Sequence, residues 1–301
     1  MMTENDPARG LREFPSRHDF LIAIDSDGCA FDTMEIKHKE CFIPNIIKHF
    51  GLQAVSRYAR QAAEFVNLYS KWRGINRFPA LIRTLDLLRE RREVAQRGVS
   101  IVELPATRAW LAGESKPGNP ALRAAVEAAD AAARDELQRV LSWSEAVNAT
   151  IAEIVAGVPP YPFVRESIQR ASAQADIIVV SATPGEALLR EWAEHDLARY
   201  TAVIAGQEMG TKAEHLRLAN SRGYQPERVL MIGDAPGDLE AARANGARFY
   251  PIRPGDEARS WQQLFDGGLD RFLTGQYDGQ YEAGQIAGFQ ALLPDTPPWQ
   301  R

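Results

Sequence analysis

Four short runs of apolar residues constrain the fold of this chain more than any other feature of its sequence. Three are continuous, at 21–24, 177–180 and 229–232, and a weaker fourth lies at 249–252. Continuous rather than alternating apolar residues are typical of strands that are covered on both faces in a parallel sheet. Parallel strands need crossover connections, which are usually helices, so the runs predict an α/β fold.

Helical patterns separate the later runs and strengthen this prediction. They span residues 184–194, 212–222 and 238–245, and Gly246 is placed to end the last of them. Residues 183–186 predict an N-cap threonine, a proline at the first helical position and a capping-box glutamate. The alternation of strand and helix predicts a doubly wound parallel sheet.

A long insertion separates the first predicted strand from the second. Its apolar residues recur at helical spacing, as at Phe78, Leu81 and Leu85, and the stretch 121–140 is rich in alanine, glutamate and arginine. The proline-rich segment 157–162 predicts a stiff hinge at its end. The insertion is therefore expected to be an all-α cap domain.

The length of 301 residues suits two domains. The expected division is a core of residues 1–32 and 163–273, a helical cap of residues 33–162, and a C-terminal extension of residues 274–301. The extension is rich in Gly, Gln and Pro and shows no clear periodicity. The sequence does not decide whether it wraps the core.

Composition excludes several classes of protein. Forty acidic against 35 basic side chains give a formal net charge of −5, and the basic residues are scattered, so no nucleic-acid partner is expected. The apolar runs are far shorter than a membrane helix, and residues 1–19 hold no apolar signal core. Two cysteines without a Cys-x-x-Cys spacing favour neither a disulfide scaffold nor a zinc site. We therefore expect a cytoplasmic protein without a membrane partner.

Polar residues follow three of the predicted strands, at 25–28, 181–183 and 233–238. The carboxyl ends of parallel strands meet at one edge of a sheet, where ligands bind. Asp25 and Asp27 are two residues apart, so both point to one side, with Cα atoms roughly 7 Å apart. Two carboxylates about 5 Å apart repel by roughly 3 kcal/mol at an effective dielectric of 20, so a cation or a proton is expected there.

The other charged groups of these motifs indicate the kind of cation. Asp234 adds a further oxygen ligand, and carboxylates without His or Cys favour a hard ion, most plausibly Mg²⁺. Asp238 is expected to cap the following helix and to lie near the metal. The expected metal-site residues are Asp25, Asp27, Asp234 and Asp238. Lys212 opens a helix, where it can neutralise a phosphoryl group.

In their order along the chain, these motifs resemble those of the haloacid dehalogenase-like (HAD) superfamily of aspartyl-phosphate-forming hydrolases. The matching positions are Asp25, Asp27 and Gly28 with Asp32 and Thr33 downstream, then Ser181, Lys212, Gly233, Asp234 and Asp238. The resemblance implies a Rossmann-like core. An insertion after the first strand resembles a helical cap of the C1 type, which closes over the site and carries substrate selectivity.

The resemblance also implies a catalytic role for each matched side chain. Asp25 would attack phosphorus, Asp27 would serve as general acid and base, and Asp234 would bind Mg²⁺. Ser181 and Lys212 would hold the phosphoryl oxygens. A carboxylate nucleophile splits hydrolysis into formation and breakdown of an aspartyl-phosphate. The expected function is a Mg²⁺-dependent phosphatase acting on a small phosphorylated metabolite.

Contacts to the substrate are expected from both parts of the molecule. The strand-end candidates are Gly28, Ala182 and Thr183. In the insertion, Arg73 and Arg77 lie in a segment that mixes cations, an amide and aromatics, which suits an anionic or polar leaving group. The same composition also suits a solvated helix start.

Other activities are open at this point. Relatives that cleave carbon–halogen bonds lack the second acidic residue of the first motif, and phosphonate-cleaving relatives usually carry a small residue there, so Asp27 argues against both. Sugar phosphomutases of the family keep the pair and typically place a histidine ten residues after the second aspartate. That position is Lys37 here, with His38 beside it, which makes a mutase the second choice. A non-catalytic binding module on the same fold is the third.

Overall fold

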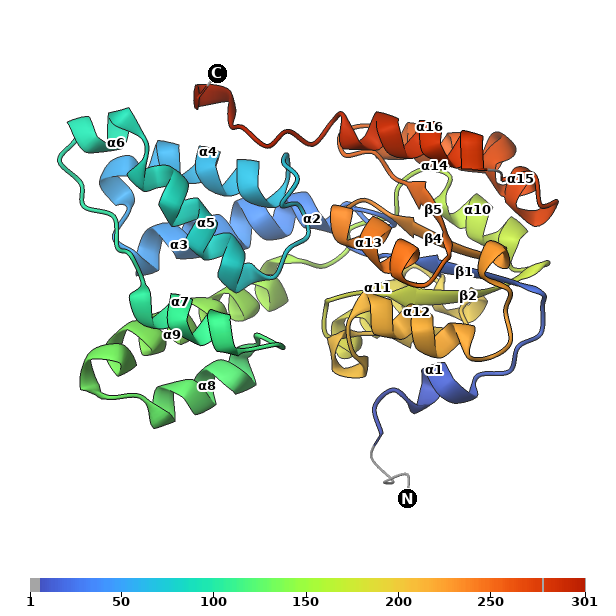
Figure 1. Cartoon of the computed structure of the whole chain (residues 1–301), viewed down its shortest axis with the longest axis horizontal. Coiled ribbons are helices and arrows are strands. Elements are labelled where there is room, and N and C mark those ends of the chain that lie inside the picture. The colour runs from blue at the N-terminus through green and yellow to red at the C-terminus, as the bar shows by residue number, and fades with distance from the viewer. Residues whose placement is uncertain (1–5, 278, 301) are drawn as a thin grey trace. The chain divides into compact units, whose positions relative to one another are not determined.

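Five parallel strands form the sheet that the apolar runs predict. The structure is a computed structural model that describes residues 6–277 and 279–300. Within these residues the strand order is β3-β2-β1-β4-β5, of which Figure 1 labels β2, β1, β4 and β5. The strands are β1 (Phe20–Ile24), β2 (Ala175–Val180), β3 (Val203–Ala205), β4 (Val229–Gly233) and β5 (Arg248–Pro251). The fold class is confirmed, and β3 is the strand that the sequence patterns did not predict.

Helices cover both faces of the sheet because each strand buries alternate side chains on opposite sides. Ile22 and Ile24 of β1 pack in one core cluster, and Leu21 and Ala23 pack in another. The first face is covered by α10 (Val164–Ala171), α11 (Gly185–Glu194), α14 (Glu257–Gln263) and α15 (Leu269–Leu273). The second is covered by α1 (Arg9–Glu13), α12 (Lys212–Asn220), α13 (Pro236–Ala244) and α16 (Gly279–Gln290).

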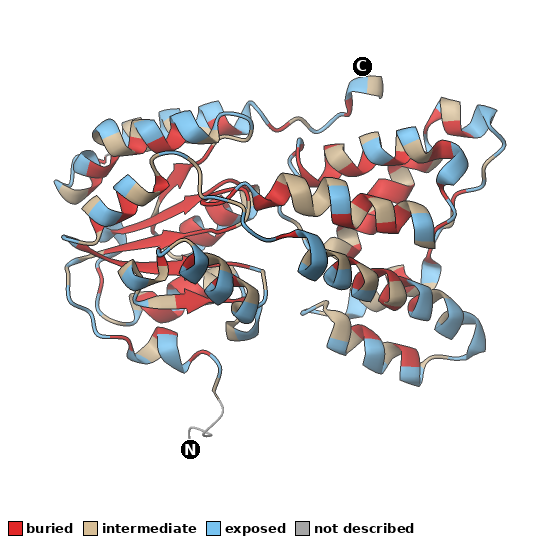
Figure 2. Ribbon diagram, turned by 180° about the vertical axis from the view of Figure 1, so that it is seen from behind, coloured by how far each residue is buried: buried red, intermediate tan, exposed pale blue. Residues whose placement is uncertain are grey.

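The strands are buried along almost their whole length, as their red colour in Figure 2 shows. A fully buried Leu, Ile or Val side chain contributes about 1.5 to 3 kcal/mol. The buried strands therefore keep the residues at the carboxyl edge of the sheet in fixed positions. Short helical turns complete this unit: η3 (Ala198–Tyr200), η4 (Gln207–Met209), η5 (Pro226–Arg228) and η6 (Leu264–Gly268).

Two predicted helix starts need correction. Helix α11 starts at Gly185 with Pro184 at the N-cap, so Thr183 is not the cap residue. Helix α13 starts at Pro236, which places Asp238 at its third position rather than at the N-cap. Asp238 still caps, because its carboxylate accepts a hydrogen bond from the N–H of Ala235 at 3.0 Å.

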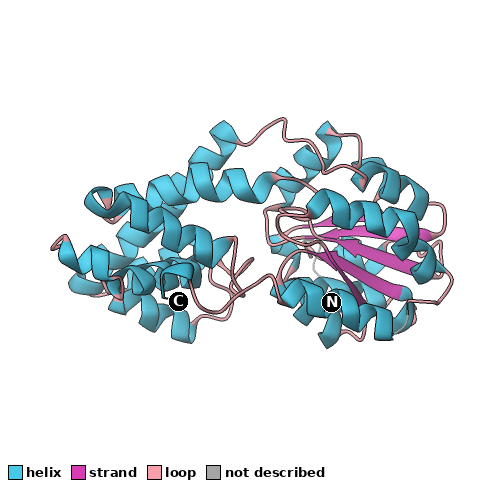
Figure 3. Ribbon diagram, turned by 90° about the horizontal axis from the view of Figure 1, so that it is seen from above, coloured by secondary structure: helices cyan, strands magenta, loops and turns pink. Residues whose placement is uncertain are grey.

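The insertion folds as a second compact unit, and its described residues form helices without strands (Figure 3). Its helices are η1 (Lys37–Phe42), α3 (Ile43–His49), η2 (Gln53–Val55), α4 (Ser56–Asn67), α5 (Arg77–Arg89), α6 (Arg92–Gln96), α7 (Pro105–Gly113), α8 (Asn119–Ala128) and α9 (Ala131–Ile154). Phe78 of α5 packs edge-on against Trp110 and Trp143 at the centre of its core. The alanine-rich stretch 121–140 is divided between α8 and α9. The division falls at Asp130, whose carboxylate caps α9 by accepting a hydrogen bond from the N–H of Ala133.

The division between the units differs from the expected one at three places. The core comprises the chain up to Met34 and Gly157–Leu293, and the helical unit comprises Glu35–Ala156 and the segment from Pro294 onward. Short helix α2 (Thr33–Ile36) spans the first crossing. The expected C-terminal extension is thus divided, with α16 in the core and η7 (Pro298–Gln300) in the helical unit. None of the helices in the described part is long and apolar enough to cross a membrane.

Candidate active site

Asp25, Ser181 and Asp234 stand at the carboxyl ends of three adjacent strands. Strand β1 lies between β2 and β4, and each of the three residues directly follows its strand. The N–H of Asp25 continues the ladder by donating to the carbonyl of Ile232 at 3.0 Å. After β1 the chain first forms β2 on one side of it and later β4 on the other. Open α/β sheets form their ligand sites at the strand where the order reverses in this way.

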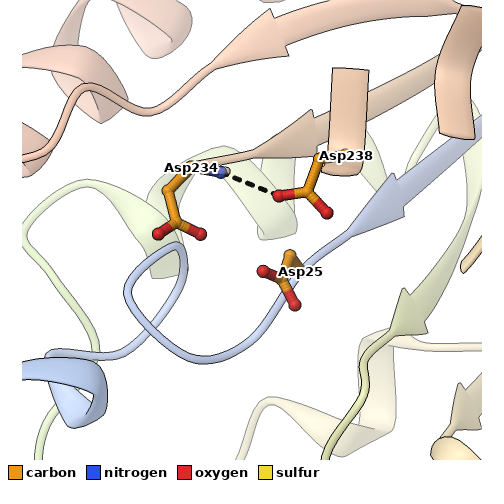
Figure 4. Close-up of side chains that lie close together, drawn as sticks. All are labelled: Asp25, Asp234 and Asp238. Atoms are coloured by element: carbon orange, nitrogen blue, oxygen red, sulfur yellow. Dashed lines mark hydrogen bonds between the residues drawn. The ribbon is translucent and has the colours of Figure 1, made fainter. Parts of the chain in front are cut away.

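Three carboxylates gather at this edge, those of Asp25, Asp234 and Asp238 (Figure 4). One oxygen from each lies within 4.8 Å of the others, and none of the side chains is appreciably exposed. The Nζ of Lys212, at the first position of α12, lies 2.8 Å from Asp25 Oδ2 and 2.6 Å from Asp238 Oδ1. The cluster therefore holds three carboxyl groups and one ammonium group.

Burial and charge alter the protonation of this cluster. Burial is the main cause that raises the pKa of Asp25 well above its ordinary value, and the carboxylates of Asp238 and Asp234 add to it, whereas Lys212 acts in the opposite direction. Burial likewise raises the pKa of Asp238, and the charge of Lys212 again acts to lower it. Burial opposes the charge of Lys212, yet Asp238 and Asp25 together raise its pKa above the ordinary value. The lysine is thus held as a cation.

Gly233 makes the close approach of Asp238 possible. A Cβ at this position would lie 2.4 Å from the Cβ of Asp238, a distance that real side chains do not tolerate. Asp238 Oδ2 accepts hydrogen bonds from the N–H groups of Asp234 at 3.1 Å and of Ala235 at 3.0 Å. The carboxylate of Asp238 therefore fixes both the loop that carries Asp234 and the ammonium of Lys212.

Asp27 is held by two hydroxyl groups. Its Oδ1 accepts from Thr33 at 2.5 Å, and its Oδ2 accepts from Thr183 at 2.8 Å. Gly28 follows with φ +76°, a left-handed conformation that favours glycine, and its N–H donates to the carbonyl of Phe31 at 2.8 Å. The tight turn so formed presents Asp27 beside the carboxyl end of β2.

The residues after β2 contribute hydroxyl and backbone groups. Ser181 is buried, and its Oγ accepts from the N–H of Thr183 at 3.2 Å. Ala182 between them is exposed. The structure therefore brings Ser181 and Thr183 to the same sheet edge as Asp25, as the order of the motifs predicts.

Part of the chain matches a known protein family. A family model described as haloacid dehalogenase-like hydrolase matches residues 118–252. Over this range, which is less than half of the chain, the protein is similar to haloacid dehalogenase-like hydrolases. The matched range contains Ser181, Lys212 and Asp234, whereas Asp25 and Asp27 precede it. No curated protein sequence matches the chain.

Several solved structures are similar to this chain. A haloacid dehalogenase-like family hydrolase from Streptococcus pneumoniae is 14% identical with a TM-score of 0.43, over 81% of this chain and 90% of that one. CbbY from Rhodobacter sphaeroides, solved in complex with phosphate, is 19% identical with a TM-score of 0.40, over 77% and 85%. A HAD-superfamily hydrolase of subfamily IA from Geobacter sulfurreducens is 14% identical with a TM-score of 0.37, over 79% and 90%.

The carboxylate cluster at the sheet edge fits a hard divalent cation. All its donors are oxygens, they are buried, and such an ion offsets the negative charge of their ionised forms. Asp25 and Asp234 would hold the ion. Asp238 belongs to the same cluster, and both of its oxygens accept hydrogen bonds, so its role as a ligand stays a prediction. Asp27 as a metal ligand stays a prediction, since its two oxygens accept from Thr33 and Thr183.

The two arginines proposed for substrate binding both make contacts within the helical unit. Arg73 is buried, and its Nη1 donates to the carbonyl of Leu68 at 2.9 Å. The Nη1 of Arg77 donates to Ser144 Oγ at 3.0 Å and to Asn148 Oδ1 at 2.7 Å, and burial lowers the pKa of Arg77 to about 10. These contacts fix the arginines in place, and their role toward a substrate remains a prediction.

Sequence reasoning missed a second group of residues around the first motif. The hydroxyl of Ser26, between the two aspartates, donates to Glu191 and accepts from the indole N–H of Trp192. Glu191 and Trp192 are one helical turn beyond Leu188, which is buried against the sheet. A glutamate on the same face as two buried apolar residues is the signal that could have found this contact.

Proposed function

We propose that this protein is a Mg²⁺-dependent phosphatase that hydrolyses a small phosphorylated metabolite through an aspartyl-phosphate intermediate. The observation that carries the proposal is the buried carboxylate of Asp25, held 2.8 Å from the ammonium of Lys212 and grouped with Asp234 at the sheet edge. A nucleophilic carboxylate needs nearby positive charge, because it must approach a phosphoryl group that is itself anionic.

The residues divide the reaction between them. An oxygen of Asp25 attacks phosphorus, and the bond between phosphorus and the leaving oxygen breaks as Asp27 gives that oxygen its proton. Water then attacks the phosphoryl group, Asp27 takes the proton of the water, and Asp25 is released with inorganic phosphate. When bound, Mg²⁺ supplies positive charge that offsets the repulsion between Asp25 and the phosphoryl oxygens.

Lys212 and Ser181 support both steps. The Nζ of Lys212 favours the ionised form of Asp25 against the effect of burial and is placed to attract phosphoryl oxygens. The hydroxyl of Ser181 stands at the adjacent strand end, where it offers a hydrogen bond to the same group. Thr33 and Thr183 hold Asp27 while it gives and regains its proton.

The proposal is tested by screening the purified protein against a panel of phosphorylated metabolites with and without Mg²⁺. Chelation with EDTA is expected to abolish phosphate release, and added Mg²⁺ is expected to restore it. Ca²⁺ is expected to inhibit, because it is larger and accepts higher coordination numbers. Full activity in excess EDTA would contradict the metal assignment, and no phosphate release from any panel member with Mg²⁺ present would contradict the phosphatase.

A further inference from the structure

Ser26 occupies the one position between the two aspartates of the first motif, and its backbone fixes both. Its N–H donates to Asp25 Oδ1 at 2.8 Å. Its carbonyl accepts from the N–H groups of Ala30 at 2.9 Å and Phe31 at 3.0 Å, which closes the turn that carries Asp27. A rotation of the backbone at Ser26 would therefore displace both carboxylates at once.

The side chain of Ser26 is anchored from outside this loop. Its Oγ donates to Glu191 Oε2 at 2.8 Å and accepts from Trp192 Nε1 at 3.0 Å. Ser26 and Trp192 are fully buried, and the Trp192 ring packs edge-on against Phe31 at a centroid distance of 5.6 Å. One hydroxyl thus acts as donor and acceptor toward the same helix, α11.

Helix α11 is well suited to orient the loop because the segment before it also holds Asp27. Thr183, two residues ahead of the helix, donates to Asp27 Oδ2. Residues 183–192 therefore contact the first motif at two points: Glu191 and Trp192 of α11 bind Ser26, and Thr183 before the helix binds Asp27. A shift of α11 would move the contacts to both points together.

We propose that Glu191 is a positioning residue, which acts through the Ser26 hydroxyl to hold the carboxylates of Asp25 and Asp27 in their reactive orientation. This inference rests on the proposed phosphatase function, since it concerns the same two carboxylates. Packing alone does not need a hydroxyl at Ser26, because an alanine would fill nearly the same volume. A buried hydroxyl with two partners instead specifies one orientation, since any other leaves buried polar groups unsatisfied.

Matched variants of Glu191 separate positioning from mere stability. Glu191→Ala removes the acceptor and is expected to lower kcat by about 10- to 100-fold while KM stays within about threefold, because substrate contacts are unchanged. Glu191→Gln keeps an acceptor oxygen at the same distance and is expected to restore kcat to within about threefold of wild type. The control is Glu194→Ala, an exposed glutamate at the end of the same helix, which is expected to leave kcat unchanged.

A second measurement does not depend on catalysis. In the metal-free protein, amide hydrogen exchange of residues 26–31 is expected to be about tenfold faster in Glu191→Ala than in wild type, and near wild type in Glu191→Gln. If the wild type releases no phosphate but the exchange pattern holds, the proposed function fails and the positioning contact stands. Unchanged exchange and a kcat within threefold of wild type in Glu191→Ala would overturn the inference, as would equal loss of kcat in both Glu191 variants.

Discussion

Asp19 and Asp25 flank the same strand and show how position decides the chemistry of a side chain. Asp19 precedes β1, and its side chain is 81% exposed and pairs with Arg228 at the surface. Asp25 follows β1, is buried, and faces Lys212. Water screens the charge of the first, so its pair contributes little to stability. The second is removed from water beside a fixed cation, which suits a nucleophile.

The nucleophile is tested by Asp25→Asn. An amide cannot attack phosphorus as a carboxylate does, so turnover is expected to fall by at least roughly a thousandfold, which corresponds to about 4 kcal/mol of barrier. Steady-state phosphate release with Mg²⁺ measures this. Asp19→Asn is the matched control and is expected to keep wild-type turnover. Near-normal activity of Asp25→Asn would rule out the mechanism.

The acid role of Asp27 is tested by Asp27→Asn with two kinds of substrate. The asparagine fits between Thr33 and Thr183 but carries no transferable proton. Turnover of alkyl phosphates is expected to fall by about 10²- to 10⁴-fold, and turnover of aryl phosphates, whose leaving oxygen is less basic, is expected to fall less. Comparing kcat for the two classes measures the difference. An equal loss for both would assign the proton to another group.

At the scale of elements, the C-terminal segment is part of the helical unit. Trp299 of η7 packs edge-on against Phe65 of α4 at 5.7 Å, and the buried guanidinium of Arg91 lies 4.3 Å from the centre of the Trp299 ring. Tyr58 offers Arg91 a second ring at 4.7 Å. The guanidinium of Arg91 thus lies against two aromatic rings and is removed from water, which strengthens its cation–π attraction to both rings.

Trp299→Ala is therefore expected to lower the free energy of unfolding of the helical unit by about 2 kcal/mol, through lost burial and lost cation–π contact. Urea denaturation combined with amide exchange of α5 measures this loss. Gln300→Ala, which removes only an exposed hydrogen bond to Glu90, is the control and is expected to change stability by less than about 0.5 kcal/mol. Equal stability of Trp299→Ala and wild type would show that the segment does not support the unit.

At the scale of the whole molecule, stability is expected to depend on pH through a buried histidine. His215 lies in α12, three residues after Lys212, and is fully buried in the core. Burial is the main cause that lowers the pKa of His215 to about 4. The positive charge of Lys212 lowers it further, whereas the negative charge of Glu214 acts in the opposite direction. The folded protein therefore keeps this ring neutral at pH values where the unfolded chain binds a proton.

The sign of the effect follows from proton binding. An unfolded histidine titrates near pH 6.5, so stability is expected to fall as pH drops from 6.5 toward 4, by on the order of 3 kcal/mol for this group. His215→Leu is expected to remove that part of the pH dependence, measured by urea unfolding at several pH values between 4 and 7. The same slope in His215→Leu would assign the dependence to other groups.

Local patterns in the sequence determined the elements and the edge at which the chemistry gathers. The three continuous apolar runs predicted β1, β2 and β4, because strands covered on both faces bury every side chain, and the weaker run predicted β5. The polar motifs follow three of those runs, and a parallel sheet places such strand ends side by side. Strand β3 escaped prediction, because three residues give too short a pattern to distinguish from a loop.

The tertiary structure decided which residues meet. Thr183 suits a helix cap by local spacing, yet its hydroxyl donates to Asp27, which is 156 residues away in the chain. Ser26 and Glu191 are 165 residues apart, and no periodicity connects them. A sequence pattern reports a segment's own preferences, whereas a hydroxyl with several partners in reach takes the one that the packed strands and helices bring to it.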